Sequence, residues 1–188
     1  MLVSKYADRL PLYRQAQIYA RQGIELDRST LADWTGRAAW WLRPLRDHLL
    51  DTLKCSAKLF ADETVAPVLD PGRGRTKRGQ LWAYARDDLP WGGNDPPAVA
   101  YRYAPDRAAE QPVEHLAGFR GVLQVDGYTG YRKLARAGEV QLAFCWAHVR
   151  RRFFEQAAGG TQPVATDVLA RIARLYAVEA DRKSTRLN

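Results

Sequence analysis

Apolar positions recur at helical spacing through the first third of the chain. They fall every three or four residues within Pro11–Arg21, and Gly23 stands where a left-handed C-cap would end such a helix. A second helix is predicted to start with Ser29 as its N-cap, and a third, amphipathic helix is predicted to end near Cys55. The pattern therefore predicts an N-terminal helical segment over residues 1–56.

From Lys58 the apolar positions alternate with polar ones, as they do in β-strands. Clusters of Asp, Pro and Gly separate the runs, and these residues form tight turns between strands. Successive short strands joined in this way favour an antiparallel meander. The predicted strands cover residues 58–62, 65–69, 81–86 and 99–103, and the first of them ends at Asp62.

The following part of the chain contains two strand-like runs with a short helical run between them. The strands are predicted over residues 122–126 and 140–144, with the helix at about 131–135. Two strands separated by a helix indicate a parallel crossover, because parallel neighbours need a long connection.

Helical patterns flank these strands on both sides along the sequence. One is predicted over about residues 107–119, and the chain from Ala147 onward is predicted to be helical, with breaks at Gly159-Gly160 and Pro163. Together the elements predict an α/β fold, a mixed sheet with flanking helices that follows an N-terminal helical segment.

The charge of the chain points to an anionic partner. Its 188 residues include 29 Lys or Arg against 21 Asp or Glu, giving a net charge of +8 and a pI near 9.7. Nucleic acid is the commonest such partner. Packing onto RNA, as ribosomal proteins do, stays open at this stage. A membrane surface is disfavoured, because the basic residues do not form one face opposite a broad apolar one.

The expected compartment is the cytoplasm. No apolar run approaches the roughly 18 residues that span a bilayer, and the start of the chain lacks the apolar core of a signal peptide. Cys55 and Cys145 give no disulfide framework, which agrees with a reducing compartment.

Asp62 and Asp126 each close a strand-like run, and this placement suits metal binding. Carboxylate oxygens are hard ligands that hold Mg²⁺ or Mn²⁺ together with phosphate oxygens, and strands fix the positions of the side chains. The alternative from spacing alone is that each carboxylate caps a turn.

Cys145 and His148 form a Cys-x-x-His pair at a predicted strand-to-helix junction. Such a pair is half of a zinc site, but a closed site needs four ligands, and the remaining candidates form no second close pair. The favoured interpretation is a buried thiol, with His148 near the metal-binding face. The remaining candidates are Cys55, His48 and His115.

Two groups of basic residues are candidates for contact with DNA phosphates. One lies on a predicted helix whose other face is apolar, and the other lies in a glycine-rich loop that lacks the Gly-Lys-Ser/Thr ending of a nucleotide-binding loop. The alternatives are a solvated helix surface and a disordered loop. The groups are Arg150, Arg151 and Arg152 on the helix, and Arg73, Arg75, Lys77 and Arg78 in the loop, which we expect to form a mobile hairpin tip.

The two helices on either side of Gly23 are typical of a helix-turn-helix, in which the second helix enters the DNA groove. A packed helical hairpin is the alternative, because Trp34, Trp40 and Trp41 suit a core as well as a groove. If the second helix binds DNA, the residues at its start would face the DNA. These are Arg28, Ser29, Thr30 and Asp33.

Several motifs stand in a fixed order along the chain. They are Asp62-Glu63-Thr64, Leu81-Trp82-Ala83-Tyr84, the run from His115 through Asp126 to Tyr128, and Cys145-Trp146-Ala147-His148 followed by three arginines. These motifs resemble the catalytic region of bacterial transposases of the insertion-sequence-66 family. The resemblance extends over essentially residues 2–179.

The resemblance implies an RNase-H-like fold and a DDE-type transposase, in which two Asp and one Glu hold two Mg²⁺ or Mn²⁺ ions. Asp62 matches the first acid and Asp126 the second, and His148 would approach the DNA. The implied partners are transposon ends, target DNA, further copies of the chain and accessory proteins of the element. We expect the third acid beyond residue 180, because neither Glu155 nor Glu179 lies in a matching stretch.

The expected organisation is that of a fragment. Residues 57–158 would form an incomplete catalytic core and residues 159–180 the helical start of an insertion, while the family's zinc-binding N-terminal portion would be absent. Residues 181–188 resemble a translated sequencing adapter and break the preceding helical stripe. The leading hypothesis is therefore a DNA transposase fragment that is inactive alone. The alternative is a non-catalytic helix-turn-helix DNA-binding protein.

Overall fold

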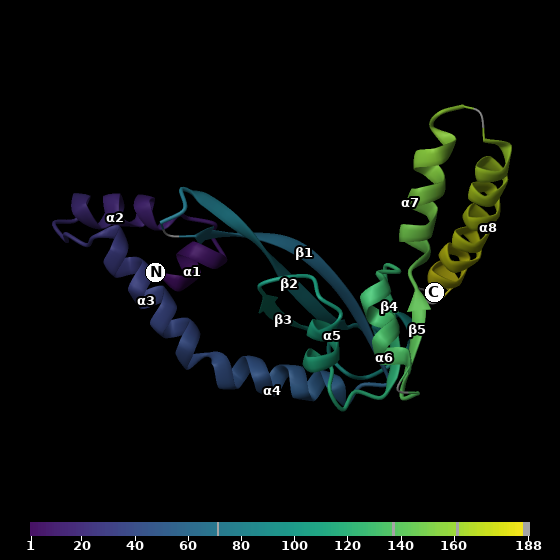
Figure 1. The fold of residues 1–188 in the computed structure, drawn as a ribbon, viewed down its shortest axis with the longest axis horizontal. Coiled ribbons are helices and arrows are strands. Elements are labelled where there is room, and N and C mark those ends of the chain that lie inside the picture. Colours follow the sequence, from purple (N-terminus) through teal and green to yellow (C-terminus); the bar gives the residue numbers. More distant parts are fainter. Residues whose placement is uncertain (71, 137, 161, 186–188) are drawn as a thin grey trace. The chain divides into compact units, whose positions relative to one another are not determined.

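The computed structural model describes residues 1–70, 72–136, 138–160 and 162–185. The chain divides into two compact units, residues 1–49 and 50–188, and Figure 1 shows the elements of each. Among the described residues, no helix combines the length and apolar character needed to cross a membrane. The predicted boundary at residue 56 stays a prediction, since the helix that spans the division continues to Lys54.

The first unit is helical, as the spacing predicted. Gly23, with φ of 78°, follows the helix that ends at Arg21, so the predicted left-handed turn is confirmed. The prediction of Ser29 as N-cap is wrong: the next helix starts at Arg28, and Asp27 occupies the N-cap with extended backbone angles. The helices are α1 (Leu2–Tyr6), α2 (Leu12–Arg21), α3 (Arg28–Trp41) and α4 (Arg43–Lys54), the last crossing into the second unit.

The second unit is built on a five-stranded mixed sheet in the order β3-β2-β1-β4-β5. The antiparallel meander is confirmed for the first three strands, and β4 lies parallel to both β1 and β5, which confirms the crossover. The strands are β1 (Lys58–Asp70), β2 (Arg75–Arg86), β3 (Ala98–Ala104), β4 (Gly121–Val125) and β5 (Val140–Phe144).

Strand β1 corrects one prediction about Asp62. The two short strands expected on either side of this residue are one strand of 13 residues, so Asp62 lies inside a strand and not at its end. The reason is the ladder with β2, which continues without a break through Asp62↔Ala83 to Asp70↔Arg75. Asp126, in contrast, follows directly after β4 as predicted.

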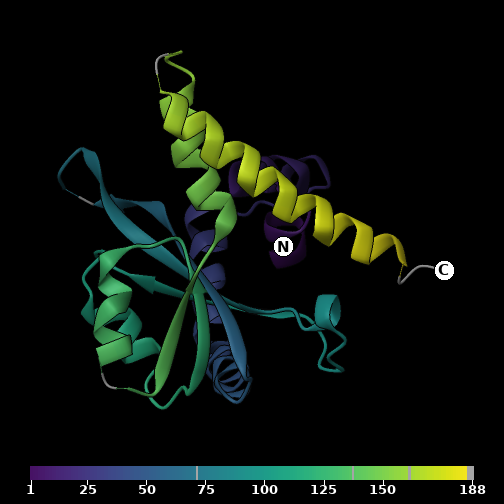
Figure 2. The same ribbon diagram turned by 90° about the vertical axis from the view of Figure 1, so that its right-hand side faces the viewer.

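Short helices cover one face of the sheet. The buried Trp82 of β2 contacts the rings of His115 and Tyr131 on that face. The helix predicted over residues 107–119 is shorter in the structure, because the backbone turns at Gly118 with φ of 82°. In Figure 2, α6 lies on one side of the sheet, and the β2–β3 loop extends on the other. The covering elements are α5 (Glu110–His115), η2 (Thr129–Tyr131) and α6 (Arg132–Arg136), and the loop contains η1 (Leu89–Trp91).

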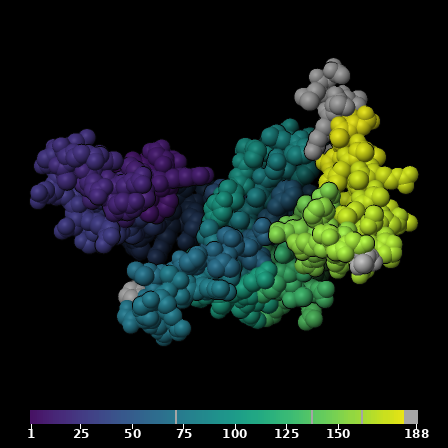
Figure 3. Space-filling model, turned by 90° about the horizontal axis from the view of Figure 1, so that it is seen from above, coloured from purple at the N-terminus to yellow at the C-terminus, as the bar shows by residue number. Residues whose placement is uncertain are grey.

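A helical hairpin follows the sheet. Helices α7 (Trp146–Ala157) and α8 (Pro163–Thr185) contact each other along their lengths and lie side by side in Figure 3. The predicted interruption between them is confirmed. Helix α8 continues through residue 181 to Thr185, and residues 186–188 lie outside the described residues. The adapter origin of the tail stays a prediction.

Gly121 at the start of β4 is predicted to be intolerant of a side chain. Its φ is 146°, and a Cβ there would lie 2.4 Å from the backbone oxygen of Ala57. That oxygen already accepts a hydrogen bond from the N–H of Val122 at 2.9 Å and has little freedom to retreat. Gly121→Ala should therefore lower the free energy of unfolding by about 2 kcal/mol in urea denaturation.

Gly118 supplies the control for this substitution. Its φ of 82° is also left-handed, but a Cβ there would meet nothing within 4 Å. Gly118→Ala should cost only the backbone strain, about 1 kcal/mol. Equal costs for the two substitutions would show that the close approach at Gly121 is unimportant.

Candidate functional site

The two aspartates come from neighbouring parallel strands. Strand β1 pairs with β4 through Phe60↔Gln124, and Asp62 and Asp126 each lie two residues further along. Because successive side chains in a strand point to opposite faces, Asp62 lies on the same sheet face as Phe60, and Asp126 on the same face as Gln124. The structure accordingly brings Asp62 and Asp126 into the lining of one hollow of about 180 Å³.

Backbone N–H groups orient both carboxylates. Oδ1 of Asp62 accepts a hydrogen bond from the N–H of Glu63 at 3.0 Å, and Oδ1 of Asp126 accepts one from the N–H of Tyr128 at 2.8 Å. The turn that brings Tyr128 back to Asp126 passes through Gly127, whose φ is 99°. The backbone thus holds Oδ1 of each aspartate, and Oδ2 of Asp126 forms an ion pair with the guanidinium of Arg107 at 4.0 Å.

A buried carboxylate stands next to Asp62. The side chain of Glu63 is only 2% exposed, and the strand alternation directs it to the helix-covered face. Its Oε1 accepts hydrogen bonds from Nε of Arg107 at 2.8 Å and from Nη2 of the same guanidinium. Its Oε2 accepts a hydrogen bond from the hydroxyl of Tyr131 at 2.8 Å. Glu63 is thus a paired structural acid on the face opposite the hollow.

Arg107 links this buried acid to the hollow. Its guanidinium carbon lies 4.1 Å from the ring centre of Tyr128, whose hydroxyl donates a hydrogen bond to the backbone oxygen of Arg107. Desolvation lowers the pKa of Arg107, but the hydrogen bond and charge of Glu63 and the charge of Asp126 raise it on balance. Burial and the charge of Glu63 both raise the pKa of Tyr131 above its ordinary value, so this hydroxyl remains a donor.

Cys145 and His148 complete the wall of the hollow beside the two aspartates. Cys145 is the N-cap of α7, and its N–H donates to the backbone oxygen of Val125 at 2.9 Å, which ties the start of α7 to the end of β4. The thiol was predicted to be buried, but the residue is half-buried, because it borders the open hollow.

The structure does not assemble a zinc site around this pair. His115 is buried and shares a hydrogen bond of 2.9 Å between its Nδ1 and the hydroxyl of Tyr84, and Cys55 is exposed. In the part of the chain that the structure describes, no three His, Cys, Asp or Glu side chains are grouped so that they could hold a metal ion. Asp62 and Asp126 are the two acidic residues that line the smaller hollow among the described residues.

A second hollow of about 400 Å³ opens on the other side of Asp126. Arg152 of α7 and Arg132 of α6 both line it, so this hollow is lined by two cations and one carboxylate among the described residues. The other two arginines predicted to bind phosphate point elsewhere. Arg150 lines a separate hollow with residues of α8, and Arg151 forms an ion pair with Glu155 at 3.0 Å.

The basic residues predicted in a loop lie mostly in a strand. Residues 75–78 belong to β2, and the described turn covers residues 72–74; residue 71 lies outside the described residues. The predicted hairpin tip is confirmed for Arg73, which lies in the turn. It is wrong for Arg75, Lys77 and Arg78, because the β1–β2 ladder continues to Asp70↔Arg75, five residues past the end of pairing between β2 and β3. The result is an exposed two-stranded ribbon that carries Arg73, Arg75, Lys77 and Arg78.

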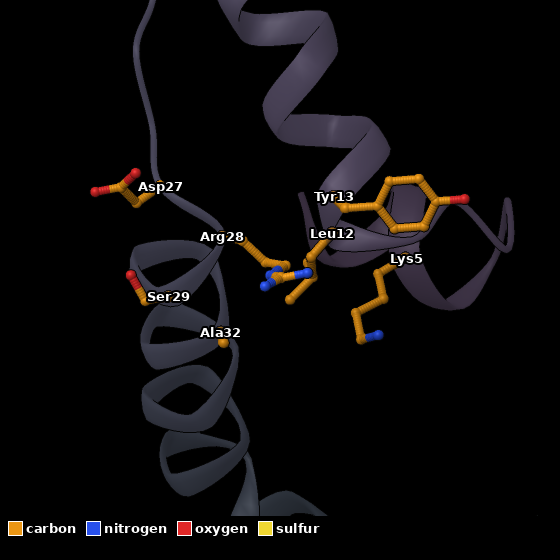
Figure 4. A pocket seen from close by; sticks show the side chains of 7 residues that line it. All are labelled: Lys5, Leu12, Tyr13, Asp27, Arg28, Ser29 and Ala32. Carbon is orange, nitrogen blue, oxygen red and sulfur yellow. The ribbon is translucent and has the colours of Figure 1, made fainter.

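The helical unit has its own candidate DNA surface. Arg28 lies at the start of α3 and reaches toward Leu12 and Lys5 across a hollow of about 560 Å³, as Figure 4 shows. Ser29 and Thr30 also lie in the first turn of α3, whereas Asp33 is paired with Arg37 at 2.7 Å. The three tryptophans that could have formed a core here are all exposed, and they are Trp34, Trp40 and Trp41.

Sequence reasoning missed three charged residues of the site, namely Glu63, Arg107 and Arg132. Glu63 carried one usable signal, since alternation in a continuous strand puts it on the face opposite Asp62. Arg107 and Arg132 carried none, because Arg107 reaches Glu63 from a loop 44 residues later and Arg132 enters the second hollow from the start of α6.

Comparison with known proteins identifies relatives of this chain and the family to which it belongs. The uncharacterized proteins y4jD and y4qI of Sinorhizobium fredii (strain NBRC 101917 / NGR234) are similar to this chain, with 49% identity over 187 residues and 48% over 184 residues. The matches cover 96% and 94% of this chain but 37% and 34% of those proteins, so the chain spans about a third of the length of the curated relatives it matches. The family model described as "Transposase IS66 family" matches residues 1–188. The chain therefore belongs to the IS66 family of transposases.

Proposed function

We propose that this chain forms the part of an RNase-H-like, DDE-type DNA transposase that carries the first two metal-binding acids, Asp62 and Asp126. The observation that carries the proposal is their meeting in one hollow from the neighbouring parallel strands β1 and β4. The strand order, with three antiparallel strands followed by two parallel ones, supports the RNase-H-like assignment. Transposon ends and target DNA are the proposed substrates.

The two aspartates fit Mg²⁺ or Mn²⁺. Both offer hard carboxylate oxygens, and a backbone N–H fixes one oxygen of each so that the other can bind a cation. Bound ions would activate a water or a DNA 3′-hydroxyl and stabilise the leaving oxygen in an in-line phosphoryl displacement. The contribution of the chain itself is to hold both acids at the same level of a rigid sheet.

Basic residues on two surfaces support the proposal that the chain contacts the DNA backbone. Arg132 and Arg152 stand beside Asp126, where they can bind the phosphates that flank a scissile bond. The exposed ribbon of β1 and β2 carries four further basic residues, and a two-stranded ribbon is narrow enough to enter a major groove. We propose that the ribbon binds a stretch of DNA at a distance from the two aspartates, whereas Arg132 and Arg152 bind the DNA next to Asp126.

The described part of the chain supplies two acids to the hollow and no third carboxylate. We therefore propose that this chain binds DNA but neither cuts nor joins it in Mg²⁺ or Mn²⁺. Robust strand transfer by the chain alone would refute the claim that it lacks an essential acid.

Metal binding tests the proposed roles of the two aspartates. Mn²⁺ is paramagnetic and should broaden the amide NMR signals around Asp62 and Asp126 before others. Asp62→Asn or Asp126→Asn should weaken Mn²⁺ binding by about tenfold or more. Loss of a residue that only hydrogen-bonds to a metal ligand already lowers metal affinity by about tenfold, and loss of the ligand itself should cost at least as much. Asp70→Asn is the matched control, because Asp70 lies on the same strand, far from the hollow, and should leave the affinity unchanged.

Two outcomes of this titration would count against the proposal. Broadening spread evenly over surface acids would show that no preferred site exists. Unchanged affinity in both Asn variants would make the aspartates structural, and the chain would then be better described as a non-catalytic DNA-binding protein.

A further inference from the structure

The β2–β3 loop places an exposed tryptophan against the sheet face that carries Asp62. Trp91 is 41% exposed, and its ring centre lies 6.1 Å from that of Phe60, with the two planes inclined by 35°. The ammonium of Lys58 lies 4.1 Å from the ring centre of Trp91 and 4.6 Å from that of Phe60. Lys58, Phe60 and Trp91 form a group that we name the aromatic–lysine cluster.

The cluster is continuous with the hollow of the two acids. Lys58, Phe60 and Asp62 alternate along β1 and so share one face of the sheet. Phe60 itself lines the hollow with Asp62 and Asp126. The residues of β2 opposite Phe60 and Asp62 are both alanines, Ala85 and Ala83, so the sheet surface between the cluster and the acids is low and open.

The charge of the cluster restricts what can occupy it. The charge of Asp88 acts on the Lys58 ammonium, whose closest recorded contacts among the described residues are the rings of Trp91 and Phe60. An apolar side chain from another protein would cover Trp91 without using this cation. A nucleotide uses both, because its base stacks on an aromatic ring and its phosphate pairs with the ammonium.

We propose that the aromatic–lysine cluster binds an unpaired nucleobase of the DNA strand, next to the phosphate that cations bound by Asp62 and Asp126 would hold. Trp91 stacks on the base, and Lys58 pairs with the adjoining phosphate. This inference rests on the proposed function, since it takes DNA as the substrate of the hollow. It adds that the DNA beside the cleavage position is unpaired, because a base in a duplex has both of its faces covered by neighbours.

The test uses the full 188-residue chain and two DNA probes. One probe is a duplex with a single-stranded end that carries aminopurine, a fluorescent adenine analogue, and the other is the same sequence fully paired. The wild-type chain should quench the unpaired aminopurine and bind that probe more tightly. Trp91→Leu keeps an apolar side chain over Phe60 but removes the large π-face, so it should lose the quenching and about tenfold in affinity for the unpaired probe. Affinity for the paired probe should change little.

Two further variants sharpen the result. Trp91→Phe keeps a smaller ring and should restore part of the quenching, which a purely structural role of Trp91 does not predict. Tyr103→Ala removes a comparably exposed aromatic residue from β3 and should leave both affinities unchanged.

The inference is overturned if Trp91→Leu weakens both probes equally or leaves the quenching intact. Its failure is distinguishable from failure of the proposed function. If Trp91→Leu keeps the quenching and Asp62→Asn loses Mn²⁺ binding, the base-binding inference is refuted and the proposed metal-binding role of the aspartates is supported. If Trp91→Leu loses the quenching and Asp62→Asn leaves Mn²⁺ binding unchanged, base binding by the cluster is supported and the proposed metal-binding role of Asp62 is refuted.

Discussion

Trp82→Ala should lower the free energy of unfolding by about 4 kcal/mol, the largest effect that we expect of a single substitution in this chain. Trp82 is 0% exposed, and its ring centre lies 5.9 Å from that of Tyr131, 6.1 Å from that of His115 and 6.3 Å from that of Tyr128. Alanine would leave a cavity at the point where β2 meets the helices that cover the sheet, and the rigid strands cannot close it. Urea denaturation followed by circular dichroism measures the change.

Trp82→Phe is the matched control for this prediction. The indole N–H of Trp82 finds no hydrogen-bond acceptor among the described residues, so phenylalanine removes a buried polar group together with some packing volume. These effects partly offset each other, and the expected cost is only about 1 kcal/mol. If phenylalanine were as destabilising as alanine, aromatic packing would not be what Trp82 contributes.

The order and pairing of the strands could be predicted because they depend on short stretches of sequence, namely the turn residues and the helix between two strands. Turn residues separate the strands of the meander, and the helix between β4 and β5 fixes their parallel arrangement. The unbroken length of β1 was not predictable, since Asp62-Glu63-Thr64 interrupts the apolar alternation and Pro67 argues against a strand. The proline is tolerated because β4 pairs with β1 only over Lys58–Phe60, which leaves the rest of β1 open along one edge.

Only those parts of the candidate site that follow from the pattern of residues within single strands could be predicted from the sequence. The meeting of Asp62 and Asp126 follows from their positions on two strands of one sheet, whatever the exact ends of those strands. The pairing of Glu63 with Arg107 follows from tertiary structure alone. A glutamate in a polar run is normally exposed, and nothing in the sequence indicates that a loop 44 residues later returns to cover it.

Arg107→Ala should lower the free energy of unfolding by about 3 kcal/mol. The carboxylate of Glu63 is 2% exposed, and Arg107 is the one cation paired with it among the described residues. Removal of one partner of a buried ion pair leaves a charge without compensation, which costs roughly 3 to 5 kcal/mol. We expect the lower end of that range because the Arg107 side chain is 46% exposed, so water can enter the space that it vacates.

Glu63→Gln provides the second corner of a double-mutant cycle with this substitution. Glutamine keeps one oxygen that can accept the hydrogen bonds of Arg107, and its NH2 group can donate to the hydroxyl oxygen of Tyr131. It carries no charge, so its own cost should be small, about 1 kcal/mol. In the Glu63→Gln background, Arg107→Ala no longer strands a buried charge and should cost about 1 kcal/mol. Additive costs would contradict the ion-pair explanation.

The same variant connects the stability of the fold to the proposed metal site. Arg107 pairs with Glu63 on one face of the sheet and lies 4.0 Å from Oδ2 of Asp126 at its edge. In Arg107→Ala, Oδ1 of Asp126 still accepts the hydrogen bond from the N–H of Tyr128, but Oδ2 loses its neighbouring cation. The NMR signals of Asp126 and Tyr128 should therefore shift in the variant, whereas those of Asp70, at the far end of β1, should not. Unchanged signals at Asp126 would confine Arg107 to a purely structural role with Glu63.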